Sequence, residues 1–401
     1  MASKKIEKIV LAYSGGLDTS VMLHWLKKKY KAEIIAVVAD VGQGIDADFL
    51  TKKAKASGAS KIYILDLKKE FVENYIWPSL KAGAIYEKQY LLGTALSRPL
   101  IAQKIVEIAH QEKANIVVHG CTGKGNDQVR LELTISYLDP TLTILAPLRE
   151  WELKTREMEI EYAQKYNIPI EATKKSPYSL DKNLWHLAIE SGDLENLEKE
   201  PQEDIYQLTT SLNKTPSNSK YLEISFENGI PVKIDDKKYD GVNLIQKLNE
   251  IGGKYGIGRV DMIESRLVGI KTREIYESPA GTILYTALSD LETLVLDRET
   301  LHYKQLLSLK YADLVYYGLW CSPLREAIDE FMNKLHIRTT GVIRIKLYKG
   351  NCCVVGRKSD YSLYRHQLAT YGKEDVFDQK LAKGFIELWG MSLKTLGEKK
   401  K

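Results

Sequence analysis

The stretch that decides the fold reads Lys8-Ile9-Val10-Leu11-Ala12-Tyr13-Ser14-Gly15-Gly16-Leu17-Asp18-Thr19-Ser20. It begins as a short apolar run with β-branched residues, which is typical of a buried parallel strand. Gly15 and Gly16 then supply the freedom in φ that a tight loop needs. A helix follows, with apolar residues at helical spacing at Val21, Met22, Trp25 and Leu26. A strand, a small-residue loop and a helix start together predict an anion site, because backbone N–H groups and the helix dipole favour negative charge there.

Three hydroxyl groups surround the two glycines of this loop, at Ser14, Thr19 and Ser20. The loop is not a Walker A motif, because it lacks the Gly-Lys-Ser/Thr that follows a four-residue gap. Its sequence resembles the pyrophosphate loop of the N-type ATP pyrophosphatases, which cleave ATP to AMP and pyrophosphate. An ordinary tight turn is the alternative, but such a turn would not need three hydroxyls and an acid around two glycines.

The composition is that of an ordinary globular protein. Of 401 residues, 44% are apolar and 28% are charged, and the net charge is +5. Lysines near both ends carry part of this charge, which favours solubility over nucleic-acid binding. Two of the four cysteines are adjacent and none forms a Cys-x-x-Cys pair, so neither a zinc site nor a disulfide framework is indicated. Without an apolar run of membrane-spanning length or a signal-peptide core, we expect a cytoplasmic protein with no membrane partner.

Apolar strands alternate with amphipathic helices through the first third of the chain. Strands are predicted at residues 6–12, 33–39, 61–66, 115–118 and 143–145. This alternation predicts an α/β fold, with a parallel sheet and helices on both faces. Ligands of such sheets bind at the carboxyl ends of the strands. Loops 14–20, 40–44 and 119–125 all fall at that edge.

A competing nucleotide motif follows the second strand. Gly42-Gln43-Gly44-Ile45-Asp46-Ala47 fits the loose dinucleotide fingerprint, with Asp66 at about the distance expected of a ribose-binding acid. Asp46 and Asp48, however, would repel a pyrophosphate where the next helix begins. We therefore disfavour an NAD site and expect Ala39 and Asp40 to flank the adenine or ribose of ATP.

A second glycine-rich loop is harder to explain as an ordinary turn. His119-Gly120-Cys121-Thr122-Gly123-Lys124-Gly125-Asn126-Asp127-Gln128-Val129-Arg130 follows the fourth strand and leads into a helix. Its charges of both signs suit a zwitterionic substrate, whose carboxylate favours Arg and whose ammonium favours a carboxylate. The alternative is a plain glycine loop in which Asn126 caps the helix. Cys121 is interpreted as a packing residue.

Together with Tyr90-Leu91-Leu92-Gly93-Thr94, these two loops closely resemble the argininosuccinate synthase family. The resemblance covers nearly the whole chain, with further matching stretches at residues 176–185, 258–264, 275–284 and 319–323. It implies that ATP drives the condensation of citrulline with aspartate. The ureido oxygen of citrulline attacks the α-phosphate and expels pyrophosphate. The aspartate amine then displaces AMP from the adenylate and gives argininosuccinate.

The resemblance also implies roles for particular residues. The ATP-binding set is Ala12, Tyr13, Ser14, Gly15, Gly16, Leu17, Asp18, Thr19, Ser20, Ala39 and Gly120. Aspartate is held by Thr122, Asn126 and Asp127, and citrulline by Tyr90, Asn126, Arg130, Ser179, Glu264 and Tyr276. Asp18, Asp127 and Arg130 are the expected catalytic residues, and Asp18 also helps to hold Mg²⁺. Taken alone, Ser179, Glu264 and Tyr276 would be interpreted as surface or capping residues.

The expected domains are a nucleotide-binding domain at residues 1–171, an α+β synthetase domain at 172–375, and a C-terminal helix and tail at 376–401. The final helix, predicted at about 378–396, carries Leu381, Phe385, Leu388 and Trp389 on one face. In the family that the chain resembles, this helix crosses between the subunits of a tetramer. Residues 195–219 are polar and are expected to form an exposed excursion.

Several positions depart from the family pattern. Ala95 and Ala188 stand where the family often has serines that contact citrulline, and Ser265 and Glu274 stand where it commonly has Asn and Gly. We expect activity with weaker citrulline binding, because each lost hydroxyl contact costs about 0.5–1.5 kcal/mol. Two further interpretations stay open: another ligase among the ATP pyrophosphatases, and a non-catalytic paralogue that binds ligands.

Overall fold

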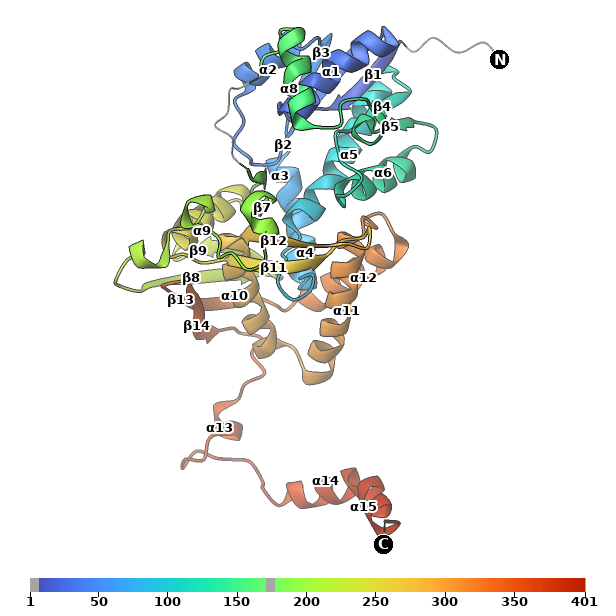
Figure 1. Cartoon of the computed structure of the whole chain (residues 1–401). Helices are drawn as coiled ribbons and strands as arrows, with labels where there is room; N and C mark the ends of the chain where they lie inside the picture. The colour runs from blue at the N-terminus through green and yellow to red at the C-terminus, as the bar shows by residue number, and fades with distance from the viewer. Residues whose placement is uncertain (1–6, 171–176, 401) are drawn as a thin grey trace.

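The computed structural model describes residues 7–170 and 177–400. Its upper part in Figure 1 holds a five-stranded sheet in which all neighbouring strands are parallel. In spatial order the strands are β3 (Lys61–Asp66), β2 (Glu33–Asp40), β1 (Lys8–Ala12), β4 (Ile116–Val118) and β5 (Thr143–Leu145). The predicted parallel sheet is therefore confirmed. The predicted start of the first strand at residue 6 lies outside the described residues.

Helices cover both faces of this sheet, also as predicted. Ile9 and Leu11 of β1 pack into one core with α1 (Leu17–Tyr30), α2 (Ala47–Ala56) and α8 (Arg156–Lys165). Val10 packs into the opposite core with α5 (Gly93–Glu112) and α6 (Asp127–Leu138). Successive strand residues face opposite sides of a sheet. The apolar run of β1 is continuous because it supplies both cores.

The second part contains two antiparallel sheets. One has the order β10-β9-β8-β13-β14, and its strands are Lys237–Lys238, Ile230–Ile234, Lys220–Glu227, Gly341–Tyr348 and Asn351–Lys358. The other has the order β11-β12-β7-β6, with strands Arg259–Ser265, Lys271–Glu277, Leu187–Glu190 and Ser179–Lys182. The long helices here are α9 (Gly241–Lys254), α10 (Pro279–Val295), α11 (Arg298–Tyr316) and α12 (Pro323–His336).

Short elements complete the described chain. They are the helices α3 (Lys68–Phe71), α4 (Trp77–Ala82), α7 (Pro147–Glu150) and α13 (His366–Ala369), the π-helical turn η1 (Val72–Ile76), and the 3₁₀ turns η2 (Gly192–Glu195), η3 (Glu203–Ile205) and η4 (Leu212–Lys214). The segment 195–219 is mostly exposed, as expected, but Ile205 packs into a small core with Leu187 and Ile275. This segment therefore also covers one face of the β11-β12-β7-β6 sheet.

The two parts of the molecule share one core. Phe71, Trp77 and Leu92 belong to the same buried cluster as Leu244 and Ile283 of the second part. Figure 1 shows α3 and α4 descending from the parallel sheet, and α4 packs against α11 and α12. At the start of α5, the Gly93 carbonyl accepts from Asn183, in the turn between β6 and β7, at 3.0 Å. The predicted boundary between residues 171 and 172 lies outside the described residues.

The predicted single C-terminal helix is wrong in one respect. The structure has two helices, α14 (Leu381–Trp389) and α15 (Met391–Glu398), which are separated at Gly390. Glycine in a helix interior is destabilising by roughly 0.5–1 kcal/mol relative to alanine, which favours a break at this position. The C-terminal arm that contains α14 and α15 extends away from the body of the protein (Figure 1). On this arm, the rings of Phe385 and Trp389 stack on each other and remain largely exposed.

Candidate active site

A cavity of about 670 Å³ lies where the carboxyl ends of β1, β2 and β4 face the β11-β12-β7-β6 sheet. All eight predicted amino-acid-binding residues line it: Tyr90, Thr122, Asn126, Asp127, Arg130, Ser179, Glu264 and Tyr276. The predicted ATP-binding residues that line it are Ala12, Tyr13, Ser14, Asp18, Thr19, Ala39 and Gly120. The structure thus brings the two predicted groups of residues to one space.

The phosphate loop has the geometry of an anion site. Gly15 has a φ of +80°, in the left-handed region that favours glycine, and a Cβ built there would lie 2.3 Å from the tip of the flexible Leu50 side chain. The hydroxyls of Ser14 and Thr19 lie 3.1 Å apart. Because the N-cap residue of α1 is Gly16, which has no side chain, the first-turn N–H groups are available to an anion.

Four residues of this loop do not line the cavity: Gly15, Gly16, Leu17 and Ser20. Ser20 is fully buried, and its hydroxyl donates to the Gly16 carbonyl oxygen at 2.7 Å. It also lies 3.1 Å from the hydroxyl of Tyr13. Its side chain therefore stabilises the loop backbone and does not face the cavity.

Asp18 is exposed at the start of α1 and lines the cavity, with Glu159 of α8 behind it. Burial and the neighbouring Asp18 carboxylate raise the pKa of Glu159 to about 8. Glu159 Oε2 is buried and has no hydrogen-bond partner among the described residues. Mg²⁺ usually binds one or two carboxylates together with phosphate oxygens and waters. Asp18 beside a phosphate loop fits such an ion, although the described residues hold no cluster of three or more His, Cys, Asp or Glu.

The competing loop at residues 42–47 is committed to other contacts. Gln43 accepts from the backbone N–H of Val41 at 2.8 Å and donates to the Ala39 carbonyl at 2.7 Å. Asp46 caps α2 by accepting from the Phe49 N–H at 2.9 Å. A carboxylate thus occupies the helix start that a pyrophosphate would need. Val37, Ala39 and Val41 form an apolar wall suited to an adenine ring.

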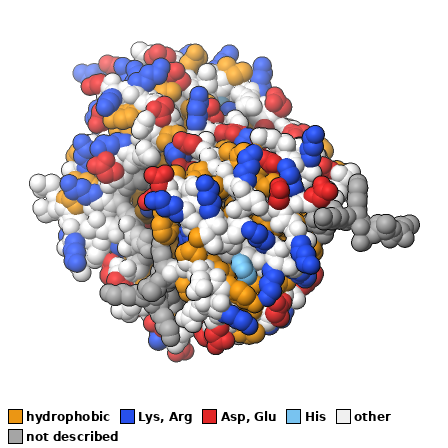
Figure 2. All heavy atoms as spheres, turned by 90° about the horizontal axis from the view of Figure 1, so that it is seen from above, with side chains coloured by type: hydrophobic (Ala, Val, Ile, Leu, Met, Phe, Trp, Pro, Cys, Tyr) orange, Lys and Arg blue, Asp and Glu red, His pale blue; other side chains and the backbone are white. Residues whose placement is uncertain are grey.

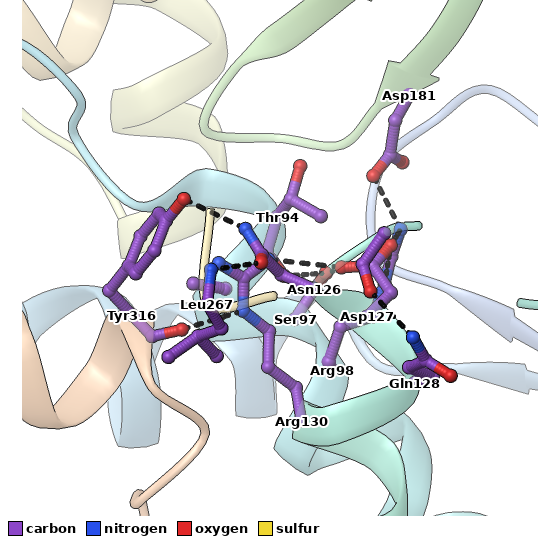
Figure 3. A network of polar contacts seen from close by, with 12 residues as sticks. Thr94, Ser97, Arg98, Asn126, Asp127, Gln128, Arg130, Asp181, Leu267 and Tyr316 are labelled. Carbon is purple, nitrogen blue, oxygen red and sulfur yellow. Dashed lines mark hydrogen bonds and ion pairs between the residues drawn. The ribbon is translucent and has the colours of Figure 1, made fainter. Parts of the chain in front are cut away.

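The second glycine loop ends in a connected set of charged side chains (Figure 3). Arg98 of α5 donates through Nη2 to Asp127 at 2.7 Å and to Asp181 at 2.5 Å. Arg130 Nη1 donates to the other oxygen of Asp127 at 3.0 Å. Burial opposes ionisation of Asp127, but Arg98 and Arg130 hold its pKa below the ordinary value. Asp127 is therefore a carboxylate able to bind an ammonium group.

One nitrogen of the Arg130 guanidinium has no hydrogen-bond partner among the described residues. The residue is 3% exposed, and its Nε donates to the Tyr316 carbonyl oxygen at 3.0 Å. Its Nη2 is buried and has no partner within the described part of the chain. A buried guanidinium nitrogen without a partner is costly in a ligand-free protein. It is well suited to a substrate carboxylate, which binds arginine strongly.

The opposite wall is one face of the β11-β12-β7-β6 sheet. Register pairs Ser179 with Glu190, and Asp181 and Tyr276 with Ala188. Because alternate residues share a face, one side of the sheet presents mostly polar groups to the cavity. These are Ser179, Asp181, Ala188, Glu190, Glu264, Glu274 and Tyr276.

Glu264 is a buried acceptor between two tyrosines. It is 3% exposed and accepts one hydrogen bond at each oxygen, from the hydroxyls of Tyr276 and Tyr316, both at 2.5 Å. Tyr90 stacks on Tyr276 with ring centroids 4.3 Å apart. Tyr276 therefore contacts both of the other predicted citrulline residues, Glu264 on the neighbouring strand and Tyr90, which is distant in sequence.

The sequence prediction missed part of the cavity wall. Arg266 donates to both Glu190 and Glu274, and its Nη2 lies 2.6 Å from Glu274 Oε1. Glu274, noted above only as a departure, is 4% exposed, and burial together with Glu190 raises its pKa. Arg98, which also lines the cavity, was recognised only as part of a helix. Tyr316, which contacts Glu264 and Asn126 without lining the cavity, was not singled out. The sequence around Glu264 and Glu274 shows no strict alternation of polar with apolar residues, so it carried no clear signal for this wall.

Three further observations concern Cys121, the surface charge and the helices. Burial raises the pKa of Cys121 to about 12, in keeping with a packing role. Seen from above, the surface carries basic and acidic side chains interspersed rather than segregated (Figure 2). No helix in residues 7–170 and 177–400 combines the length and apolarity needed to cross a membrane.

Comparisons with known proteins match both parts of the chain. The family model for the arginosuccinate synthase N-terminal HUP domain matches residues 8–169, and the model for the C-terminal domain matches residues 178–396. The argininosuccinate synthase of Caldanaerobacter subterraneus subsp. tengcongensis is 58% identical over 390 residues, covering 97% of this chain and 95% of that protein. That of Desulfitobacterium hafniense is 55% identical over 397 residues, covering 98% and 99%. The chain therefore belongs to the argininosuccinate synthase family of ligases.

Proposed function

We propose that this protein condenses L-citrulline with L-aspartate at the expense of ATP, giving argininosuccinate, AMP and pyrophosphate. One observation carries the proposal. A single cavity joins the phosphate loop at residues 14–20 to a buried guanidinium nitrogen of Arg130 that has no partner among the described residues. A nucleotide and an amino-acid carboxylate can therefore meet there. The second loop, with Thr122, Asn126 and Asp127, provides room and charge for another amino acid.

The chemistry requires positioning more than proton transfer. The ureido oxygen of citrulline forms a bond to the α-phosphorus of ATP while the bond to pyrophosphate breaks. The aspartate amine then bonds to the activated carbon, and AMP leaves. Ser14, Thr19 and the first-turn N–H groups of α1 neutralise charge on the departing pyrophosphate. Holding both reactants in one cavity supplies much of the rate enhancement of such reactions.

Each amino acid has complementary charges on the cavity wall. Arg130 pairs with the citrulline carboxylate, and Glu264 accepts from its ammonium or ureido N–H groups. Asp127, kept ionised by two arginines, accepts from the aspartate ammonium, with Thr122 and Asn126 as further partners. Mg²⁺, held by Asp18 together with phosphate oxygens, would supply positive charge to the triphosphate.

We further propose that the active form is a homotetramer held by the C-terminal arm. The arm consists of residues 376–401, and α14 and α15 within it expose large apolar side chains at Leu381, Phe385, Ile386, Leu388, Trp389 and Leu393. An apolar surface of this kind usually marks an interaction site. Sedimentation of the full chain and of a chain ending at residue 375 tests this. The same number of subunits in both particles would contradict the proposal.

Pyrophosphate release tests the function. The full chain is given ATP, and citrulline and aspartate are omitted in turn. Release that needs citrulline, with steady turnover only when aspartate is present, supports the synthase. Release that is independent of both amino acids would instead favour another ATP pyrophosphatase, and no release at all would favour a binding paralogue.

A matched pair of variants tests whether this activity resides in the cavity. Arg130→Gln removes the guanidinium that we assign to citrulline and is expected to raise citrulline KM by about 100-fold. Arg149→Gln removes a neighbouring arginine that pairs with Glu132 and does not line the cavity. Equal effects of the two changes would contradict the assignment.

A further inference from the structure

Tyr316, at the last position of α11, contacts three of the residues that we assign to substrates. Its hydroxyl donates to Glu264 at 2.5 Å and accepts from the Asn126 amide at 2.8 Å. Its carbonyl oxygen accepts from Arg130 Nε at 3.0 Å. We infer that Tyr316 is a positioning residue for both amino-acid sites. This inference rests on the proposed function and adds a residue that sets substrate affinity.

The ring of Tyr316 is itself firmly placed. It is fully buried and stacks on Tyr86, with centroids 3.6 Å apart and an interplanar angle of 8°. The Arg130 guanidinium carbon lies 4.9 Å from its centroid, within the range of a cation–π contact. A hydroxyl on a ring held this way has few orientations available, so its two hydrogen bonds have defined directions.

The chain after α11 keeps α11 close to α6. Gly318 has a φ of +75°, and a Cβ built there would lie 2.8 Å from the Arg130 Cα. This close approach brings the Tyr316 carbonyl to the Arg130 side chain. Arg130 is thereby held at Nε and Nη1, while Nη2 stays unpartnered among the described residues. Tyr316 thus helps to aim the free nitrogen of Arg130 at the cavity.

Asn126 is held at both ends of its amide. Its oxygen accepts from the backbone N–H of Leu267 at 2.9 Å, and its nitrogen donates to Tyr316 (Figure 3). Leu267 lies in the turn after β11, so this contact joins the second glycine loop to the antiparallel sheet. One tyrosine hydroxyl therefore connects Asn126, which we assign to both substrates, with Glu264, which we assign to citrulline. Members of such a hydrogen-bonded chain reinforce one another.

Tyr316→Phe removes the hydroxyl and keeps the ring, the stacking and the carbonyl contact to Arg130. Hydrogen bonds to a buried charge are among the stronger ones in proteins. We therefore expect a rise of about 10- to 100-fold in citrulline KM and about 2- to 10-fold in aspartate KM. The KM for ATP and the melting temperature should stay close to those of the wild type, because the phosphate loop and the ring packing are untouched.

Tyr317→Phe is the matched control. It is the same change at the next residue, whose ring lies edge-on to Tyr316 at 6.1 Å. Unlike Tyr316, its hydroxyl makes no hydrogen bond to Glu264 or Asn126. Its kinetic constants should equal those of the wild type. Unchanged citrulline KM in Y316F would overturn the inference. Equal shifts in all three KM values with a lower melting temperature, or a chain that does not fold, would also overturn it, because they would indicate a purely structural role.

A double-mutant cycle provides a second measurement. Glu264→Gln removes the charge that Tyr316 contacts, so adding Y316F to that variant should change citrulline KM by less than about threefold. Independent, multiplying effects would contradict action through Glu264. The proposed function is judged separately, by citrulline-dependent pyrophosphate release in the wild type. A wild type that passes that test beside an unaffected Y316F would refute only the role of Tyr316.

Discussion

Replacing Arg98 should lower kcat/KM for aspartate more than it affects any other step of the reaction. Arg98 donates from Nε and Nη2 to Asp127 and from Nη2 to Asp181, and its side chain is 16% exposed. Removing one partner of a buried ion pair costs about 3–5 kcal/mol. The Asp127 side chain is 26% exposed, so solvent reduces this to roughly 2–3 kcal/mol. Arg98→Gln should therefore lower kcat/KM for aspartate by roughly 30- to 150-fold.

Steady-state pyrophosphate release with varied aspartate measures this loss, and a single turnover with ATP and citrulline alone should be nearly normal. Arg98→Lys should fall between wild type and R98Q, because a lysine cannot reproduce the arginine fork. Lys104→Gln is the control. Lys104 lies on the same helix and also bridges two acids, Glu70 and Glu107, with a side chain that is 15% exposed. An R98Q enzyme with normal aspartate kcat/KM, or one no worse than K104Q, would refute the reasoning.

Three other predictions address the phosphate loop and two buried titratable groups. Gly15→Ala should raise ATP KM severalfold, because an alanine at a φ of +80° strains the phosphate loop and its Cβ would shift the Leu50 tip, whereas Gly44→Ala, with a similar φ of +81° outside that loop, should have little effect on ATP KM. Equal ATP KM values in the two variants would contradict a phosphate role for the first loop. Burial raises the pKa of Glu274, so folding stability should fall as the pH rises from about 4.5 toward that raised value, and Glu274→Gln should flatten this fall in melting temperature. Parallel pH profiles for E274Q and the wild type would contradict this. Burial lowers the pKa of His186 to about 4, so the free energy of unfolding should drop by about 3 kcal/mol as the pH falls from 6.5 to 4. His186→Asn should remove most of this pH dependence, as measured by urea titrations. An unchanged pH dependence in this variant would contradict the prediction.

The parallel sheet could be predicted from sequence because its central strands, β1, β2 and β4, are buried on both faces. A continuous run such as Ile9-Val10-Leu11 is too short for a helix and contains β-branched residues, and it leads directly into a glycine loop, so a buried strand is favoured. Chain order then places that loop and the one ending at Arg130 at the same edge of the sheet. The phosphate side of the cavity follows from these two facts alone.

The antiparallel wall could not be predicted in the same way. Glu190, Glu264 and Glu274 lie in segments without strict alternation, so their sequences do not tell a polar strand face that meets solvent from one that lines a cavity. The polar face in fact lines a cavity, and only the tertiary structure distinguishes the two. The hydroxyl of Ser20 was expected at the phosphate but points to the Gly16 carbonyl, because helix geometry brings a side-chain oxygen near the carbonyl four residues earlier.

A crystal structure with ATP and citrulline tests the central claim most directly. The account predicts the β- and γ-phosphates against Ser14, Thr19 and the first turn of α1, with the citrulline carboxylate on Arg130 Nη2. Phosphates bound against residues 42–47, or a citrulline carboxylate held away from Arg130, would contradict it.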